Sequence, residues 1–302
     1  MKRQIKNRSL TDNFIGSCLI LFLVIAPVKN DAWAQLPKKF DNLAQALAAP
    51  EEVEWLDLKD RDLEEFPEVI FQFKNLRFLD LSGNRLANLP EEISTLSKLM
   101  YLDISGTSIR KVPESMGDLS TLNTIHLANL PQLDFEQVLP VISQIASLKV
   151  LDLKYDNLQE VPAFIQFFKH LEVLDLSGNP LETVPQELTK LQNLRILYLN
   201  DDNALDLARS MDALVKFDQL RELHLENNEI SNIPEEIYEI RSLEYLYLNQ
   251  NKLQVLPLSM GKMPNLKYLD VYGNPIPDIF LDEYQKFLPP SIKINIWNRY
   301  KK

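Results

Sequence analysis

Aromatic, acidic and histidine side chains recur in this sequence about every 23 residues, at two positions separated by a single residue. Tyrosine and tryptophan are enriched where protein partners bind most tightly, and carboxylates attract cationic groups. The residues of these two columns that we select as candidate partner contacts are Trp55, Asp57, Phe78, Asp80, Tyr101, Asp103, His126, Tyr198, His224, Tyr245, Tyr247 and Tyr268. They predict a surface that binds a partner carrying basic and apolar groups.

The same residues give little support to catalysis or to metal binding. The three histidines, His126, His170 and His224, include no pair with metal-ligand spacing, and Cys18 is the only cysteine. The sequence contains no GxSxG, P-loop or GxGxxG motif. A row of aspartates could hold Ca²⁺, but these aspartates do not lie in a loop of the kind that surrounds the ion. We therefore expect a non-enzymatic protein without cofactor or metal.

A repeated phrase of leucines sets the spacing of these residues. From Leu171 it reads LEVLDLSGNPLETVPQELTKL, and similar phrases begin at Leu76 and Leu243. The alternation Leu174-x-Leu176 predicts a short strand with one face buried and one face toward solvent. Asn179 follows at a turn, and Pro185, which has no N–H, favours an unpaired return arm. Units that repeat in this way cannot bury their leucines alone, so they predict a stacked array with one continuous core.

Ten such units cover residues 53–276. They begin at Val53, Leu76, Leu99, Leu122, Leu148, Leu171, Leu194, Leu220, Leu243 and Leu266. Seven of the nine steps are 23 residues long, whereas the units from Leu122 and Leu194 have 26 residues and lack the proline of the return arm. Helical spacing over 135–142 and 205–214 predicts a longer helix in each of these two units, and 3₁₀ or single helical turns in the others.

The pattern LxxLxLxxNxLxxLPxxIxxLxxL resembles the leucine-rich repeat family, and within it the 23-residue class of Ras-suppressor and plant intracellular Ras-group proteins, which is also common in bacteria. The resemblance implies an α/β solenoid, curved as a horseshoe, with parallel strands on the concave face and 3₁₀ or short helices on the convex face. The candidate contacts would then face solvent on the concave side. We expect a protein or peptide to bind there. A glycan or cell-wall ligand, stacked on exposed aromatic rings, is the alternative.

Residues 1–34 predict a signal peptide. A basic start is followed by an apolar run from Phe14 to Val28 and by the small residues Ala32 and Ala34. An uncleaved N-terminal anchor is the alternative. The segment has a net charge of +3 and the whole chain −11, so the remainder carries −14. This acidity argues against nucleic acid and anionic lipid as partners, and export without disulfides fits a bacterial envelope protein. We expect a monomer that does not insert into a membrane after cleavage.

Two flanking segments predict caps for the open ends of the array. Residues 35–52 contain a short amphipathic helix with Asp41 as its N-cap and Pro50 as its stop. Residues 277–302 contain an amphipathic helix ended by Pro289 and Pro290, and then an alternating stretch that predicts an edge strand.

Overall fold

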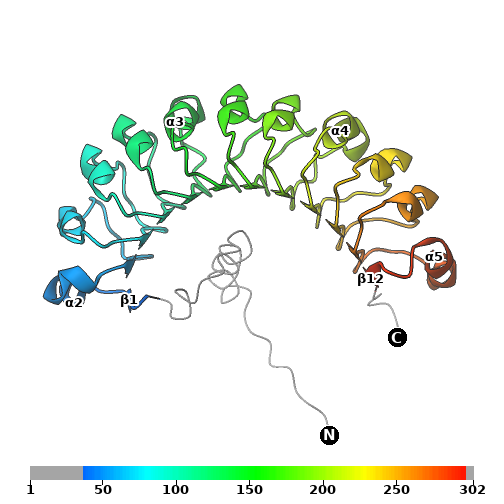
Figure 1. Cartoon of the computed structure of the whole chain (residues 1–302), viewed down its shortest axis with the longest axis horizontal. Helices are drawn as coiled ribbons and strands as arrows, with labels where there is room; N and C mark the ends of the chain where they lie inside the picture. Colours follow the sequence, from blue (N-terminus) through cyan, green and yellow to red (C-terminus); the bar gives the residue numbers. More distant parts are fainter. Residues whose placement is uncertain (1–36, 297–302) are drawn as a thin grey trace, which may run out of the picture. The chain divides into compact units, whose positions relative to one another are not determined.

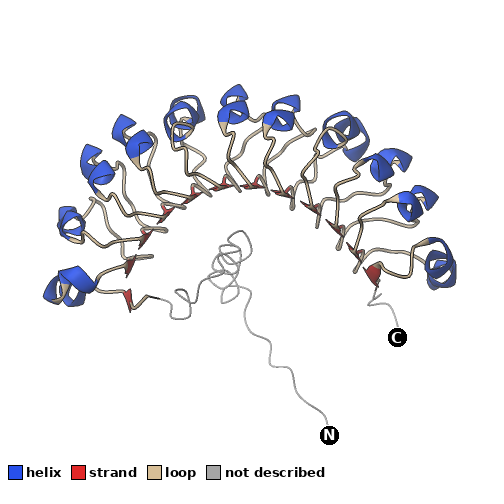
Figure 2. Ribbon diagram, in the orientation of Figure 1, coloured by secondary structure: helices blue, strands red, loops and turns tan. Residues whose placement is uncertain are grey.

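The computed structural model describes residues 37–296, so the predicted signal peptide (1–34) and the last six residues lie outside the described part of the chain. The chain divides into two units, Met1–Pro37 and Lys38–Lys302, and the fold described here is that of the second. This unit is a curved solenoid with strands along its concave side and helices along its convex side (Figures 1 and 2). The twelve strands of the described residues form a single parallel sheet in chain order. The predicted α/β solenoid is confirmed.

The strands are short because each unit passes only once across the sheet. Their bounds are β1 Lys39–Phe40, β2 Trp55–Asp57, β3 Phe78–Asp80, β4 Tyr101–Asp103, β5 Thr124–His126, β6 Val150–Asp152, β7 Val173–Asp175, β8 Ile196–Tyr198, β9 Glu222–His224, β10 Tyr245–Tyr247, β11 Tyr268–Asp270 and β12 Lys293–Asn295. The central residue of each strand from β2 to β11 is a fully buried leucine or isoleucine. The two residues that flank it must therefore point to the concave side.

The convex side carries 3₁₀ turns and four α-helices among the described residues. The turns are η2 Pro50–Glu52, η3 Glu68–Gln72, η4 Glu91–Thr95, η5 Glu114–Asp118, η6 Ala163–Phe167, η7 Gln186–Lys190, η8 Glu235–Glu239, η9 Leu258–Lys262 and η10 Asp278–Phe280. The α-helices are α2 Leu43–Ala48, α3 Phe135–Ile142, α4 Leu207–Leu214 and α5 Leu281–Phe287. As predicted, the two 26-residue units are those with α-helices, α3 and α4. Helix α4 begins two residues later than the pattern indicated, because Asp206 caps it by accepting from the Arg209 N–H.

Buried asparagines bind adjacent units together at the turn that follows the strand in five of the ten units. Asn179 is 1% exposed. Its Oδ1 accepts from the backbone N–H groups of Asp156 (3.1 Å) and Leu158 (2.9 Å) in the preceding unit. Its Nδ2 donates to the carbonyls of Leu153 and Leu176, both at 2.8 Å. One side chain thus satisfies four backbone groups that would otherwise be buried without partners.

The N-terminal cap differs from the prediction in three details. Asn42, not Asp41, is the N-cap of α2, because its Oδ1 accepts from the N–H groups of Ala44 (2.8 Å) and Gln45 (3.3 Å). Both residue types cap helices well, so residue type alone could not decide between neighbours. Pro50 starts the 3₁₀ turn η2 instead of simply ending the helix. Strand β1 was not predicted; it pairs with β2 and places Lys39 beside Trp55.

The C-terminal cap follows the predicted order of helix and edge strand. Turn η10 and helix α5 precede β12, which pairs in parallel with β11. Tyr284 of α5 is buried, and its hydroxyl accepts from the Leu256 N–H at 3.0 Å, so the cap is tied to the last repeats.

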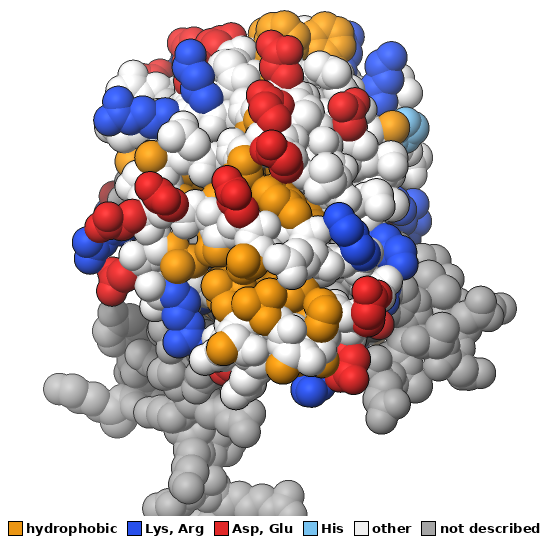
Figure 3. Space-filling model, turned by 90° about the vertical axis from the view of Figure 1, so that its left-hand side faces the viewer, with side chains coloured by type: hydrophobic (Ala, Val, Ile, Leu, Met, Phe, Trp, Pro, Cys, Tyr) orange, Lys and Arg blue, Asp and Glu red, His pale blue; other side chains and the backbone are white. Residues whose placement is uncertain are grey.

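Seen from the N-terminal end, the described surface shows a patch of hydrophobic side chains low in the view and a row of acidic side chains above it (Figure 3). Leu47 of α2 is 39% exposed at that end.

Candidate binding surface on the concave face

The parallel register aligns the candidate residues in two columns across the strands. Trp55 lies beside Phe78, and Phe78 beside Tyr101. The second column places Asp57, Asp80 and Asp103 side by side in the same way. We call these six residues the N-terminal patch. The predicted alignment of aromatic and acidic side chains is therefore present at this end of the concave face.

The aromatic rings of the N-terminal patch are less exposed than the sequence predicts. Phe78 is only 8% exposed, while Trp55 and Tyr101 are half-buried. Ring centroids are 6.1 Å apart for Trp55 and Phe78, and 6.4 Å for Phe78 and Tyr101. Side chains on the inner side of a curved sheet converge, so each ring packs against the ring of the next strand. The expectation that all these rings face solvent freely is wrong for Phe78.

Asp80 is the carboxylate of the N-terminal patch whose ionisation its surroundings change. Burial, together with the nearby charges of Asp103 and Asp57, raises the pKa of Asp80 to about 6, against the lowering effect of hydrogen bonds from Ser82. At the N-terminal end, the ammonium of Lys39 lies 3.0 Å from Asp57 Oδ2 and 5.8 Å from the centroid of the Trp55 ring. A cation held between a carboxylate and an aromatic ring thus already occupies the end of the patch.

His126 forms a buried pair in the centre of the concave face. Its Nδ1 lies 2.8 Å from Asp152 Oδ2, and the Lys154 ammonium lies 3.3 Å from the same oxygen. Burial alone would raise the pKa of Asp152, but the hydrogen bond and charge of His126, together with Lys154, lower it overall. Tyr101 packs on the His126 ring at 5.2 Å. At 6% exposure, His126 supports the fold and contributes little open surface. Sequence reasoning did not include Asp152 or Lys154 in the site, although the 26-residue unit places Asp152 in the same column as His126.

Three rings of the second column form a continuous stack at the other end of the concave face. The His224 ring lies between Tyr198 and Tyr247, with centroid distances of 4.1 Å and 4.2 Å and interplanar angles of 26° and 9°. Tyr268 is tilted against Tyr247 at 5.5 Å. Tyr245 lies between Glu222 and Tyr268 in the first column. We call Tyr198, His224, Tyr245, Tyr247 and Tyr268 the C-terminal patch.

Two glutamates that the sequence analysis did not select flank the stacked histidine. His224 Nδ1 lies 3.1 Å from Glu226 Oε1, and its Nε2 lies 3.7 Å from Glu222 Oε2. Burial would lower the pKa of His224, but hydrogen bonds and charges from Glu222 and Glu226 raise it overall. Burial also raises the pKa of Tyr247 to about 12, with Glu222 as the next contribution. Glu222 could have been selected from the sequence because it lies in the first column. Glu226 follows the strand and lies in neither column, so the repeat pattern does not point to it.

Between the two patches, the first column of the concave face consists of shorter side chains that are mostly buried. The first column there consists of Thr124, Val150, Val173 and Ile196, each at most 8% exposed. The concave face therefore presents two polar aromatic patches. The stretch between them is mainly aliphatic in the first column and holds the buried His126–Asp152 pair in the second. Within residues 37–296, no group of three or more histidine, cysteine or acidic side chains is arranged to hold a metal ion. In that same range, no helix has the length and apolarity needed to cross a bilayer.

Comparisons with known proteins agree with this architecture. Internalin C2 from Listeria monocytogenes is 21% identical, with a TM-score of 0.53 over 67% of this chain and 83% of the internalin chain. The Arabidopsis receptor kinase HAESA, solved with the peptide hormone IDA and the co-receptor SERK1, is 24% identical, with a TM-score of 0.53 over 74% of this chain and 38% of the receptor chain. The plant receptor RGFR1, solved with RGF2, is 23% identical over 72% of this chain, with a TM-score of 0.48. The matched part spans 35% of the RGFR1 chain and 38% of the HAESA chain.

Sequence comparison identifies the repeats themselves. No curated protein matches the chain as a relative. Residues 55–139 match the family described as "Leucine-rich repeat region", and residues 146–205 and 218–276 match "Leucine rich repeat". These segments include most of the ten units whose strands and buried asparagines are described above. The chain therefore belongs to the leucine-rich repeat family.

Proposed function

We propose that this protein is an exported, non-enzymatic binding module that holds a protein or peptide on its concave face. The observation that carries the proposal is the pair of patches on one sheet. Aromatic rings lie beside Asp57, Asp80 and Asp103 in the N-terminal patch, and beside the neighbouring Glu222 and Glu226 at the C-terminal patch. Rigid aromatic side chains contribute large contact areas at low entropic cost, and carboxylates select cationic groups. The partner that fits best carries Lys or Arg side chains next to apolar ones.

The position of Lys39 supports this choice of partner. Its ammonium binds Asp57 and lies over the Trp55 ring, as a lysine of a partner could do at Asp80 and Asp103. Among the structures with the same fold, HAESA was solved with a peptide hormone. That likeness supports a role in binding without identifying the ligand of this chain.

The ring geometry favours a protein partner over a glycan. A sugar ring stacks on an open aromatic face, but the faces of His224 are covered by Tyr198 and Tyr247 at 4.1 Å and 4.2 Å. Phe78 is similarly packed between Trp55 and Tyr101. What the patches offer are ring edges, hydroxyl groups and carboxylates, which suit the side chains of a peptide.

Capture of partners from envelope extracts on the immobilised protein, followed by affinity measurements, tests the proposal. Tyr247→Ala is expected to weaken binding of the captured partner by about 2 kcal/mol or more, about thirtyfold, because it removes an aromatic anchor from the C-terminal patch. The matched control is Tyr238→Ala, which removes a tyrosine from the convex turn η8. Equal losses of affinity in both variants, or a loss in the control alone, would show that the partner does not bind at the concave face.

A further inference from the structure

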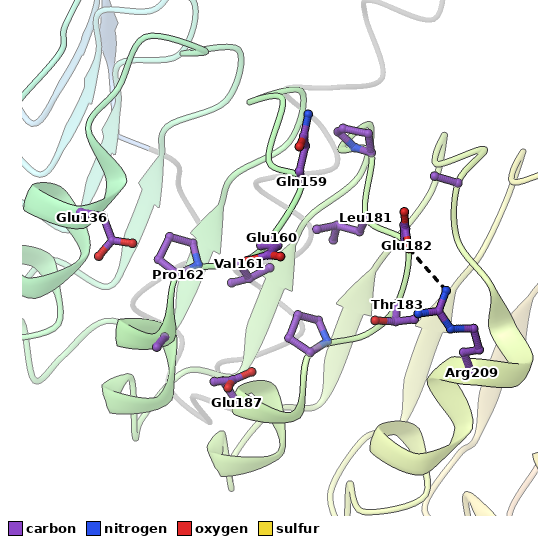
Figure 4. A pocket seen from close by; sticks show the side chains of 14 residues that line it. Glu136, Gln159, Glu160, Val161, Pro162, Leu181, Glu182, Thr183, Glu187 and Arg209 are labelled. Atoms are coloured by element: carbon purple, nitrogen blue, oxygen red, sulfur yellow. Dashed lines mark hydrogen bonds and ion pairs between the residues drawn. The ribbon is translucent and has the colours of Figure 1, made fainter.

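A second surface feature lies on the outside of the array, away from both concave columns. It is a hollow of about 920 Å³ whose lining comes from α3, from the return arms before η6 and η7, and from α4 with the residues before it (Figure 4). None of the residues of the N-terminal or C-terminal patch lines it. Whatever binds there would not compete for the concave face.

The order of long and short units explains why the hollow forms at this place. Two 23-residue units, beginning at Leu148 and Leu171, lie between the two 26-residue units. The long units end in eight-residue α-helices, whereas η6 and η7 have five residues each. Helices α3 and α4 therefore lie on either side of the two shorter turns η6 and η7 along the convex side (Figure 1).

The floor of the hollow is apolar and extended. Pro162, Pro180 and Pro185 come from the two return arms, and the neighbouring Val161 and Leu181 are buried. Proline has no N–H to offer a neighbouring strand, so the two arms form no strand ladder with each other, and single bonds such as that from the Asp206 N–H to the Glu182 carbonyl (2.9 Å) tie them to the next unit. The proline rings form a shallow apolar track against which a second extended chain can pack without disturbing the sheet.

The walls of the hollow carry excess negative charge. Glu136, Glu160, Glu182 and Glu187 line it, and Arg209 is its only basic lining residue. Arg209 Nη1 lies 3.4 Å from Glu182 Oε2. In the described part of the chain, no ion pair involves Glu136, Glu160 or Glu187. A guanidinium from α4 thus reaches one carboxylate, and three carboxylates are left to attract another cation.

The turn η6, which contributes to the lining of the hollow, also carries two exposed aromatic side chains. Turn η6 begins at Ala163, which lines it, and continues to Phe164 and Phe167, which are 39% and 50% exposed. Their ring centroids are 5.5 Å apart. Large apolar side chains gathered on an outer surface commonly mark an interaction site.

We propose that the hollow between α3 and α4 binds an extended basic segment of a partner protein. Proline or leucine side chains of the segment pack on the return arms, and its Arg or Lys side chains pair with Glu160, Glu187 and Glu136. The apolar track fixes the direction of the segment, and the unpaired carboxylates select its charge. This site is independent of the concave surface, so one molecule can hold two partners at once.

A fluorophore placed in the hollow tests the proposal locally. Cys18 is the only cysteine, so Thr183→Cys in a Cys18→Ser background allows a single label on the lining of the hollow. The probes are a twelve-residue peptide that repeats Arg-Pro-Leu and a matched peptide that repeats Glu-Pro-Leu. We expect a saturable fluorescence change with the basic peptide and none with the acidic one.

Paired charge variants then assign the response. Glu160→Gln with Glu187→Gln should weaken binding of the basic peptide about tenfold, since two carboxylates are neutralised without a change of shape. Glu235→Gln with Glu236→Gln on η8, and Asp80→Asn with Asp103→Asn on the concave face, should leave it within about twofold. Absence of a saturable response, an equal response to the acidic peptide, or a loss as large in the concave variant would overturn the proposal, whatever the outcome for concave binding.

Discussion

Asp156 occupies a turn position that asparagine fills in five of the ten units. Its Oδ1 accepts from the Leu130 N–H at 2.6 Å, while Oδ2 is buried without a hydrogen-bond partner among the described residues. Burial raises the pKa of Asp156 to about 8, and the charge of Asp152 adds to this effect. The carboxyl is therefore protonated at neutral pH. A protonated carboxyl has an O–H donor where asparagine has an N–H donor, so Asp156 fits an asparagine site in its neutral form.

Asp156→Asn is expected to raise the free energy of unfolding by about 1–3 kcal/mol at pH 8, because the amide supplies the donor without binding a proton. The pKa of Asp156 in the folded state lies above its ordinary value of 3.8. The folded protein thus holds the extra proton between about pH 4 and pH 8, and the stability of the parent falls as pH rises through this window.

Urea unfolding at several pH values measures the effect of Asp156→Asn. The gain in stability should shrink as the pH falls toward 4 and reach its minimum below that pH, where the unfolded parent is also protonated at this position. The exposed Asp118 of turn η5 provides a matched control, and Asp118→Asn should not show this pH dependence. A gain of the same size at every pH would mean that Asp156 is ionised in the folded protein.

At the scale of the element, one turn asparagine and one strand leucine determine how a unit is held in the stack. Asn179→Ala should lower the free energy of unfolding by about 1–3 kcal/mol, because four backbone groups lose their buried partner. Leu174→Ala should cost about 2–5 kcal/mol, because Leu174 is fully buried and the packed neighbours cannot fill the cavity. Denaturant unfolding measures both. Asn203→Ala is the matched control. Asn203 is exposed and follows Asp202, which holds the turn position that Asn179 holds in its own unit, so this change should alter stability by less than about 0.5 kcal/mol.

The elements could be predicted from the sequence because their signals are local and repeated. Alternating leucines define strands, and the three extra residues in the units from Leu122 and Leu194 define α3 and α4. Strand β1 was missed because Lys39–Phe40 contains no leucine pair, and it forms only by pairing with β2.

The residues that make up the candidate surface could be predicted from the sequence, but how deeply each of them is buried could not. The columns follow from register, whereas the burial of Phe78 and His126 follows from the curvature of the whole sheet. The contacts of His224 with Glu222 and Glu226 likewise depend on how far the strands converge. The hollow between α3 and α4 depends on the order of the units, which no single repeat encodes.

At the scale of the whole molecule, the prediction that can be tested first concerns export. The basic start, the apolar run and the residues Ala32 and Ala34 predict cleavage before Gln35. N-terminal sequencing of the protein from its native source is expected to begin at Gln35. A sequence that begins at Met1 would support the anchor alternative and would leave the proposed binding surfaces unchanged.

The lengths of the units follow a second, longer period along the chain. The block from Leu122 to Leu194 contains one 26-residue and two 23-residue units, and the block from Leu194 to Leu266 has the same composition, so both are 72 residues long. Their helices α3 and α4 are even capped by the equivalent aspartates, Asp134 and Asp206. From Leu122 to Leu266 the chain therefore carries a longer period of three units on top of the single repeat, and each such block brings its own border helix to the convex side.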